Sequence, residues 1–99
     1  MFPYVLSPDA LQDLQDIWDF IASDNVVAAD KLEDELFEAF EMLAKRPGMG
    51  HARSDLAERN VQFWPVGKYL IVYRGFPSPP QVVAVLHGAR DVAEVIRKR

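Results

Sequence analysis

The hydrophobic pattern of this chain changes its period near the middle, and this change constrains the fold more than any other feature. Before residue 45, apolar residues recur every three or four positions, which is the spacing of one face of an α-helix. After residue 60, β-branched and aromatic residues come in short runs that are typical of strands. The pattern therefore predicts an α+β protein in which two helices precede most of the sheet.

Two amphipathic helices are predicted in the first half, after a short strand at residues 2–6. Ser7-Pro8-Asp9 is a helix start, because it combines a serine N-cap, a proline in the first turn and an acid. Ser23-Asp24-Asn25 ends this helix and caps the second, which ends at Pro47-Gly48-Met49-Gly50. The first apolar stripe is Leu11, Leu14, Ile17, Trp18, Ile21 and Ala22, with Asp13, Asp16 and Asp19 expected largely outside it. The second stripe is Ala29, Leu32, Leu36, Ala39, Phe40, Leu43 and Ala44.

Three strands are predicted in the second half, at residues 61–64, 69–73 and 82–86. Their short connections require an antiparallel meander. A last short helix is expected to start at Asp91, which has Glu94 three residues later in the spacing of a capping box. The expected fold is β-α-α-β-β-β with a short C-terminal helix, a helical hairpin packed on an antiparallel-rich sheet, as a single domain over residues 1–99.

Composition excludes several classes of protein. The 99 residues contain no cysteine, which excludes disulfides and thiolate metal sites and fits a cytoplasmic protein. No apolar run approaches the roughly 20 residues of a membrane helix, and the N-terminus has no basic segment of the kind that opens a signal peptide. There is no glycine-rich phosphate loop and no metal-spaced cluster, so we expect no metal and no cofactor.

Charge is divided unevenly along the chain. Residues 1–44 hold eleven acids and one base, which gives −10, whereas residues 45–99 hold four acids and ten Lys or Arg, which gives +6. One interpretation is that the acidic half faces a basic partner and the other half an anion or acidic partner. The alternative is that the acids only line solvated helix faces.

The ionisable residues that could transfer a proton or bind an anion lie in the second half of the chain. His87 ends a strand and is either a general acid or base or a histidine bonded to backbone; His51 is a second candidate for proton transfer. Nothing in their spacing shows that they meet. Arg74 and Arg90 could bind a phosphate or carboxylate, whereas Arg53 and Asp55 fit a salt-bridged loop.

Several short motifs appear along the chain in an order that is found in a known protein superfamily. They are Ser7…Ala10-x-x-Asp13-Leu14-x-x-Ile17-Trp18, Ala28-Ala29, Leu43-Ala44-x-x-Pro47-x-x-Gly50-x-x-Arg53-x-Asp55-Leu56, Phe63-x-x-Val66-Gly67-x-Tyr69-Leu70-Ile71-x-Tyr73-Arg74 and Val85-Leu86-His87-Gly88-Ala89-Arg90-Asp91. With these motifs the chain resembles the RelE/ParE superfamily of bacterial type II toxin–antitoxin modules, and the last motif is closest to the ParE branch.

The resemblance implies a cytoplasmic toxin that a ParD-like antitoxin neutralises by direct binding. ParE-like toxins inhibit DNA gyrase and block replication, with DNA involved through the gyrase complex, whereas RelE-like relatives cut messenger RNA on the ribosome. The acidic balance, and the absence of His or Tyr from the final Val-Ile-Arg-Lys-Arg, favour the gyrase inhibitor over the endoribonuclease. Whether the chain is an enzyme stays open, and a non-toxic antitoxin-binding module is a third alternative.

Two sets of residues follow from this resemblance and from side-chain chemistry. The residues expected to form a basic face that binds the target and causes toxicity are Arg74, His87, Arg90, Arg97, Lys98 and Arg99. Those expected to bind the antitoxin are Trp18, Glu33, Phe37, Glu38 and Trp64, because aromatic anchors often dominate interfaces and acids suit a basic segment. For Trp18 the alternative is a core position.

Overall fold

The elements follow the predicted α+β order, and the computed structural model describes residues 3–52, 61–76, 79–88 and 92–99. In chain order they are β1 (Val5–Leu6), α1 (Pro8–Ala22), α2 (Val26–Lys45), the 3₁₀ turn η1 (Pro47–Met49), β2 (His51–Ala52), β3 (Gln62–Val66), β4 (Tyr69–Arg74), β5 (Gln81–His87) and α3 (Val92–Arg97). The predicted helical hairpin, meander and C-terminal helix are confirmed.

The strands form one sheet in the order β1-β5-β4-β3-β2. β1 is parallel to β5, and every other neighbouring pair is antiparallel, as the short connections required. β1 is shorter than the strand predicted at residues 2–6, of which Phe2 lies outside the described residues. β2 was not predicted, because two exposed residues are too few to show a period.

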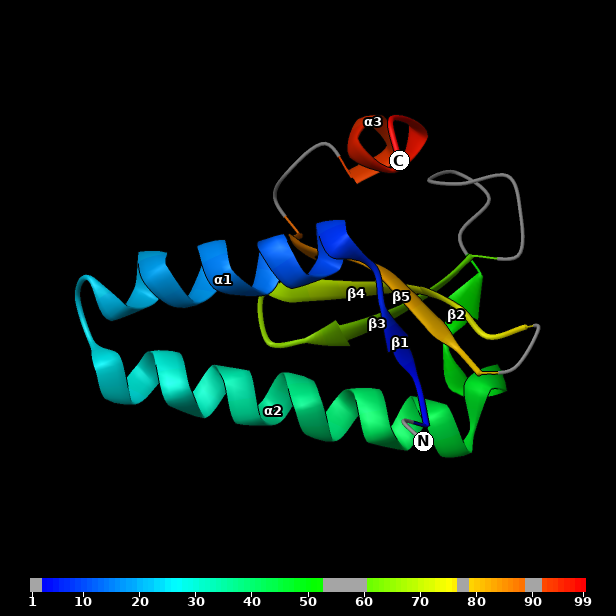
Figure 1. Ribbon diagram of the computed structural model, residues 1–99, viewed down its shortest axis with the longest axis horizontal. Coiled ribbons are helices and arrows are strands. Elements are labelled where there is room, and N and C mark those ends of the chain that lie inside the picture. The colour runs from blue at the N-terminus through cyan, green and yellow to red at the C-terminus, as the bar shows by residue number, and fades with distance from the viewer. Residues whose placement is uncertain (1–2, 53–60, 77–78, 89–91) are drawn as a thin grey trace.

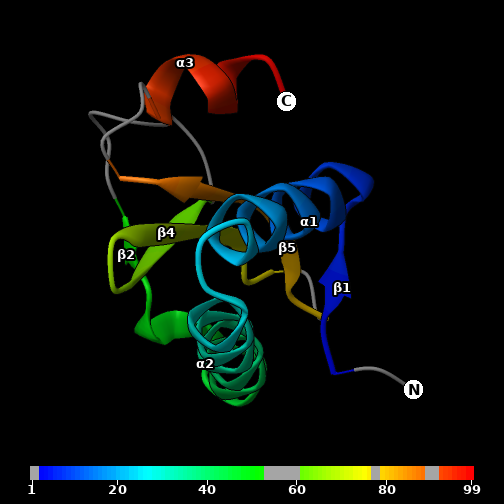
Figure 2. The same cartoon turned by 90° about the vertical axis from the view of Figure 1, so that its left-hand side faces the viewer.

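The sheet is covered on both faces (Figures 1 and 2). α1 and α2 run side by side over one face, where the core contains Leu36, Phe40, Ile71, Tyr73 and Val85. A second core lies on the other face beneath α3, and its members are Val61, Phe63, Val72, Ala84, Leu86 and Val92. The short C-terminal helix is therefore part of the folded structure, because it covers apolar side chains that the hairpin does not reach.

Both predicted helix starts are confirmed by their capping bonds. The Ser7 hydroxyl accepts a hydrogen bond from the Ala10 N–H at 3.0 Å. The Asn25 side chain accepts one from the Ala28 N–H, also at 3.0 Å. Each cap satisfies one backbone donor that has no partner inside the helix. The predicted cap of the last helix, Asp91, lies outside the described residues.

The buried face of α1 differs from the predicted stripe. Leu11 is 53% exposed, whereas Asp13, expected outside the stripe, is 8% exposed, and Ala10 is fully buried. The reason is that α1 contacts both α2 and β5, so the face that it buries includes the side turned toward β5. The prediction for Asp13 was therefore wrong, and its carboxylate has a structural partner described below.

Tyr73 connects the end of the helical hairpin to the middle of the sheet. Its hydroxyl donates to the Pro47 carbonyl at 2.7 Å and accepts from the Gly50 N–H at 2.8 Å. A Cβ atom on Gly50 would lie 2.7 Å from two ring carbons of Tyr73, so this contact requires glycine. Burial raises the pKa of the Tyr73 phenol above its ordinary value, and the bond from Gly50 partly opposes this rise.

We predict that Tyr73→Phe lowers the free energy of unfolding by about 1–3 kcal/mol, because it leaves two partly buried backbone groups, the Pro47 carbonyl and the Gly50 N–H, without this partner. A raised folded-state pKa stabilises the fold fully below the unfolded pKa of about 10 and loses that contribution as pH rises through the folded value. Urea unfolding from pH 8 to 11 should therefore show the difference between wild type and variant shrinking above pH 10. A difference that does not change with pH would contradict this assignment.

Candidate functional site

The outer edge of β5 is closed by side chains where β1 ends. A register shift beside Val72 and Tyr73 leaves Val83 without a partner on β4, which is a β-bulge. The Val83 carbonyl accepts from the Ser7 hydroxyl at 3.3 Å and from Arg99 Nη1 at 3.4 Å. Two residues later, the Val85 N–H donates to Asp13 Oδ2 at 3.0 Å. Polar side chains thus replace a neighbouring strand along this edge.

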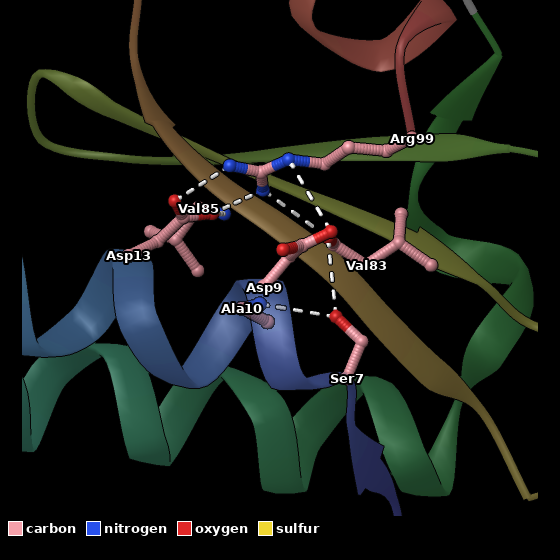
Figure 3. A network of polar contacts seen from close by, with 7 residues as sticks. All are labelled: Ser7, Asp9, Ala10, Asp13, Val83, Val85 and Arg99. Carbon is pink, nitrogen blue, oxygen red and sulfur yellow. Dashed lines mark hydrogen bonds and ion pairs between the residues drawn. The ribbon is translucent and has the colours of Figure 1, made fainter.

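Asp13 and Arg99 form a two-point ion pair at the centre of this edge (Figure 3). Arg99 Nη1 lies 2.6 Å from Asp13 Oδ2, and Arg99 Nη2 lies 2.9 Å from Asp13 Oδ1. The side chains are 10% and 22% exposed, and Asp9 Oδ2 lies 3.8 Å from Arg99 Nε. The pair joins the last residue of the chain to α1, 86 residues away, so it holds the C-terminal segment against β5.

The surroundings of Arg99 stabilise its protonated state. The hydrogen bonds to Asp13 raise the pKa of the Arg99 guanidinium above its ordinary value; burial opposes this rise, and the charges of Asp13 and Asp9 add to it. Since arginine is already protonated at neutral pH, the Arg99 guanidinium stays charged and does not serve as a proton-transfer group.

Arg74 lies at the same end of the sheet as Arg99. Both line a small cavity of about 160 Å³, together with Asp9, Ser7, Gln81 and Ile96. Arg74 ends β4 and is exposed, and its side chain makes no hydrogen bond or ion pair with the described residues. Of the residues predicted to cause toxicity, the structure thus brings together Arg74, which is accessible, and Arg99, which is already engaged.

His87 lies at the opposite end of the same pair of strands. It pairs with Tyr69, whereas Arg74 pairs with Gln81, so five residue steps of about 3.3 Å separate the two ends by roughly 17 Å. The His87 ring packs edge-on against Tyr69, with ring centroids 5.3 Å apart. An open groove of about 360 Å³ borders this end, lined by His87, Tyr69, Val85, Asp13, Asp16, Ile17 and Phe20.

The other described residues predicted to cause toxicity, Arg97 and Lys98, do not join either group. Arg97 and Lys98 both pair with Glu94 on their own helix, and their side chains are exposed. Arg90 lies outside the described residues, as do Arg53 and Asp55. The predicted basic face is thus divided between the Arg74 end, the His87 end and the surface of α3.

Most of the residues predicted to bind the antitoxin lie along the hairpin. The partly buried Trp18 donates from its indole to Oδ1 of the exposed Asp30 at 2.9 Å, which connects α1 to α2. Phe37 packs edge-on against Phe40 at 5.4 Å and is also partly buried. Asp30, Glu33 and Phe37 follow the i, i+3, i+7 spacing of one helix face, so Trp18, Glu33 and Phe37 share a continuous stripe.

Glu38 and Trp64 lie apart from that stripe. Glu38 is exposed and borders an open groove of about 390 Å³ near the end of α2, with Glu41, Met42 and Met49. Trp64 lies on β3, stacked on the His51 ring at a centroid distance of 6.1 Å, and packs against the hairpin core. The structure therefore does not gather the five predicted residues into one surface.

Within the described residues there is no group of three or more His, Asp or Glu that could hold a metal ion. Over the same residues, no helix is long and apolar enough to cross a membrane. The two histidines do not meet, because His51 is on β2 and His87 on β5, three strand spacings or roughly 14 Å apart.

Asp13 is the central residue that the sequence analysis missed, although one signal pointed to it. It lies three residues after Ala10 and four before Ile17, in the register of a buried stripe. An acid at such a position is costly to bury unless it is paired. That signal indicates a partner but does not name it, since Arg99 is at the far end of the chain.

We predict that Arg99→Ala lowers the free energy of unfolding by about 2 kcal/mol, because it leaves the buried Asp13 carboxylate without its counter-ion. Arg97→Ala is the matched control and should change it by less than about 0.5 kcal/mol, since its pair with Glu94 is exposed. A double-mutant cycle of Asp13→Ala with Arg99→Ala, measured by urea unfolding, should give a coupling energy of at least about 1 kcal/mol. Equal effects of Arg99→Ala and Arg97→Ala would show that the ion pair is not what holds the C-terminal segment.

Comparisons with known proteins agree with this architecture. A family model described as the ParE toxin of type II toxin–antitoxin systems, parDE, matches residues 4–92. A solved structure described as the chromosomal ParDE TA system from P. aeruginosa matches with a TM-score of 0.69, covering 85% of this chain and 92% of that chain. At 17% sequence identity, this likeness shows the fold alone. No curated protein sequence matches the chain. The family match spans most of the chain and confirms the resemblance to the ParE branch: the chain belongs to the ParE family of type II toxins.

Proposed function

We propose that this chain inhibits DNA gyrase in the cytoplasm and so blocks replication, and that a ParD-like antitoxin neutralises it by direct binding. Membership of the ParE family over residues 4–92 is the observation that carries the proposal. The solved structure of similar fold is itself described as a ParDE toxin–antitoxin system, which supports a cognate antitoxin here.

The arrangement of side chains favours a protein inhibitor over a nuclease. Cleavage of RNA by attack of the 2′-hydroxyl needs a base, an acid and positive charge around one phosphate. The two histidines are separated by two intervening strands. His87 lies at the end of the sheet opposite Arg74, and His51 is level with Val72 but two strands away from Arg74. The described residues thus offer no pair of proton-transfer groups beside a cationic site, which supports action by binding.

Arg74 is the described cation best suited to contact the target. It is exposed and held at the end of a central strand, and its side chain has no partner among the described residues, so binding an anion would not break an internal side-chain bond. Arg97 and Lys98 extend basic charge over the surface of α3. These residues fit an acidic protein surface or the DNA held by gyrase.

The outer surface of the hairpin is suited to the antitoxin. The stripe of Trp18, Glu33 and Phe37 combines partly buried aromatic rings with acids. At the end of the hairpin, Phe20, Val26 and Val27 are 76%, 52% and 78% exposed. An amphipathic segment with basic residues would cover such a surface, because its apolar side meets the rings and its charges meet the acids.

We predict that induction of the chain alone in bacteria lowers DNA synthesis before protein synthesis, measured by pulse labelling over the first minutes. Arg74→Ala should delay the fall in DNA synthesis. Lys45→Ala, which removes one charge from another exposed residue, is the matched control. Trapping of cleaved DNA by purified gyrase would then be tested directly. An earlier fall in protein synthesis would instead support ribosome-dependent RNA cleavage, and no growth defect would support a module that only binds the antitoxin.

A second prediction concerns the acidic surface of α2. Glu33→Lys combined with Glu38→Lys should weaken antitoxin binding by roughly threefold to tenfold at low salt and by less at high salt, because surface charges are screened. Glu35→Lys, exposed on the same helix, should have a smaller effect for each charge reversed. Isothermal titration of the purified pair at two salt concentrations measures the difference. Unchanged affinity in the double variant would remove these acids from the interface.

A further inference from the structure

The site that holds Arg99 has the construction of a receptor for an arginine side chain. Asp13 supplies both carboxylate oxygens to the guanidinium, the Val83 carbonyl supplies a third acceptor, and Asp9 lies 3.8 Å away. The Val85 N–H holds Asp13 Oδ2 at 3.0 Å from the other side, so the carboxylate is positioned by backbone as well as by its counter-ion. Two parallel acceptors in one plane match the fork of a guanidinium and not the point charge of an ammonium.

The present occupant of the site, Arg99, follows α3, a helix of only six residues. The other cations of this segment, Arg97 and Lys98, pair within α3 rather than with α1 or the sheet. Beyond the ion pair, α3 is held by apolar contacts of Val92, Val95 and Ile96 with the second core. An arginine from elsewhere would therefore compete with a tethered but lightly held side chain.

The Asp13 carboxylate can be approached from a second side. Asp13 also lines the open groove of about 360 Å³ that lies between α1 and the end of β5; Figure 3 shows its contacts with Arg99. The groove has apolar walls from Ile17 and from Phe20, which is 76% exposed, and a further acid, Asp16, at its margin. This lining suits a bulky apolar side chain next to a basic one.

We propose that an arginine of the antitoxin occupies this site in place of Arg99, with a neighbouring bulky apolar side chain in the groove between Ile17 and Phe20, and that this exchange releases α3 from the sheet. The inference rests on the proposed function for the identity of the partner. The charge of −10 over residues 1–44 favours a basic segment at this position. Release of α3 would uncover the second core around Phe63, Val72 and Leu86.

The receptor is tested without the antitoxin, in the full-length Arg99→Ala variant. Ethylguanidinium chloride is added in millimolar steps, and the amide resonance of Val85 is followed by NMR, because this N–H bonds directly to Asp13. The resonance should shift in a saturable manner, whereas ethylammonium at equal concentration should shift it little, and Arg99→Ala with Asp13→Asn should not respond. Equal responses to both cations, or a response that does not saturate, would contradict the proposal that this site is a receptor for a guanidinium.

The exchange is tested by the affinity of the purified cognate antitoxin for four full-length forms. Arg99 competes with the antitoxin arginine for the same site, so it lowers the apparent affinity of wild type for the antitoxin. Arg99→Ala should therefore bind the antitoxin several-fold more tightly than wild type, and Arg99→Lys should also bind it more tightly. Asp13→Asn should bind more weakly than Arg99→Ala. In wild type, the antitoxin should also broaden or shift the amide resonances of Ala93 and Val95 as α3 is released.

Two results would overturn the exchange in different ways. If Arg99→Ala binds the antitoxin as well as or less well than wild type, Arg99 is only a structural anchor and does not compete. If wild type binds no antitoxin at all, the proposed function itself is wrong. The proposal that an arginine of the antitoxin occupies the site is then wrong as well. The ethylguanidinium titration distinguishes these cases, because it depends on the pocket alone.

Discussion

The bonds that Asp13 makes with the Val85 N–H and with Arg99 join the parts of this structure that the chain separates most widely. β5 is the strand that contacts β1, α1 and β4, and α3 packs over the same sheet. On the outer edge of β5, β1 pairs through only two residues before Ser7 starts α1, so the backbone groups beyond Val82 need other partners. The Asp13 carboxylate and the Arg99 guanidinium bond to these groups at Val85 and Val83. The same groups that close the edge also discourage strand addition by other chains, since no open ladder remains at Val83.

A buried ion pair of this kind is a means of specificity more than a source of stability. Removing two charges from water costs about as much as their attraction returns, but removing one partner leaves an uncompensated buried charge. The pair therefore penalises arrangements in which Arg99 is elsewhere, and it does so without making the folded state unusually stable. This combination is what makes an exchange of one guanidinium for another energetically feasible. A large apolar contact in the same place would hold α3 more permanently.

The function follows less from the fold than from how charged and aromatic side chains are distributed on it. The sequence analysis treated Arg74, His87 and the C-terminal cations as one basic face, because their order along the chain gave no reason to separate them. Antiparallel pairing places the end of β4 and the end of β5 at opposite ends of the sheet, which divides that face. Among the residues predicted to bind the antitoxin, Glu33 and Phe37 lie along one side of α2, because they are four positions apart on the helix.

Local patterns in the sequence were sufficient for the helices, their serine and asparagine caps and the strands of the meander, because these depend on residues a few positions apart. They also contained the motifs by which the ParE family is recognised. The two-residue strand β2, the bulge at Val83 and the burial of Asp13 were decided only in three dimensions. Each depends on a partner far along the chain, and for Asp13 that partner is 86 residues away. The spacing of apolar residues shows which face of a helix is buried on average, but only the packed structure determines which acid on that face meets a guanidinium.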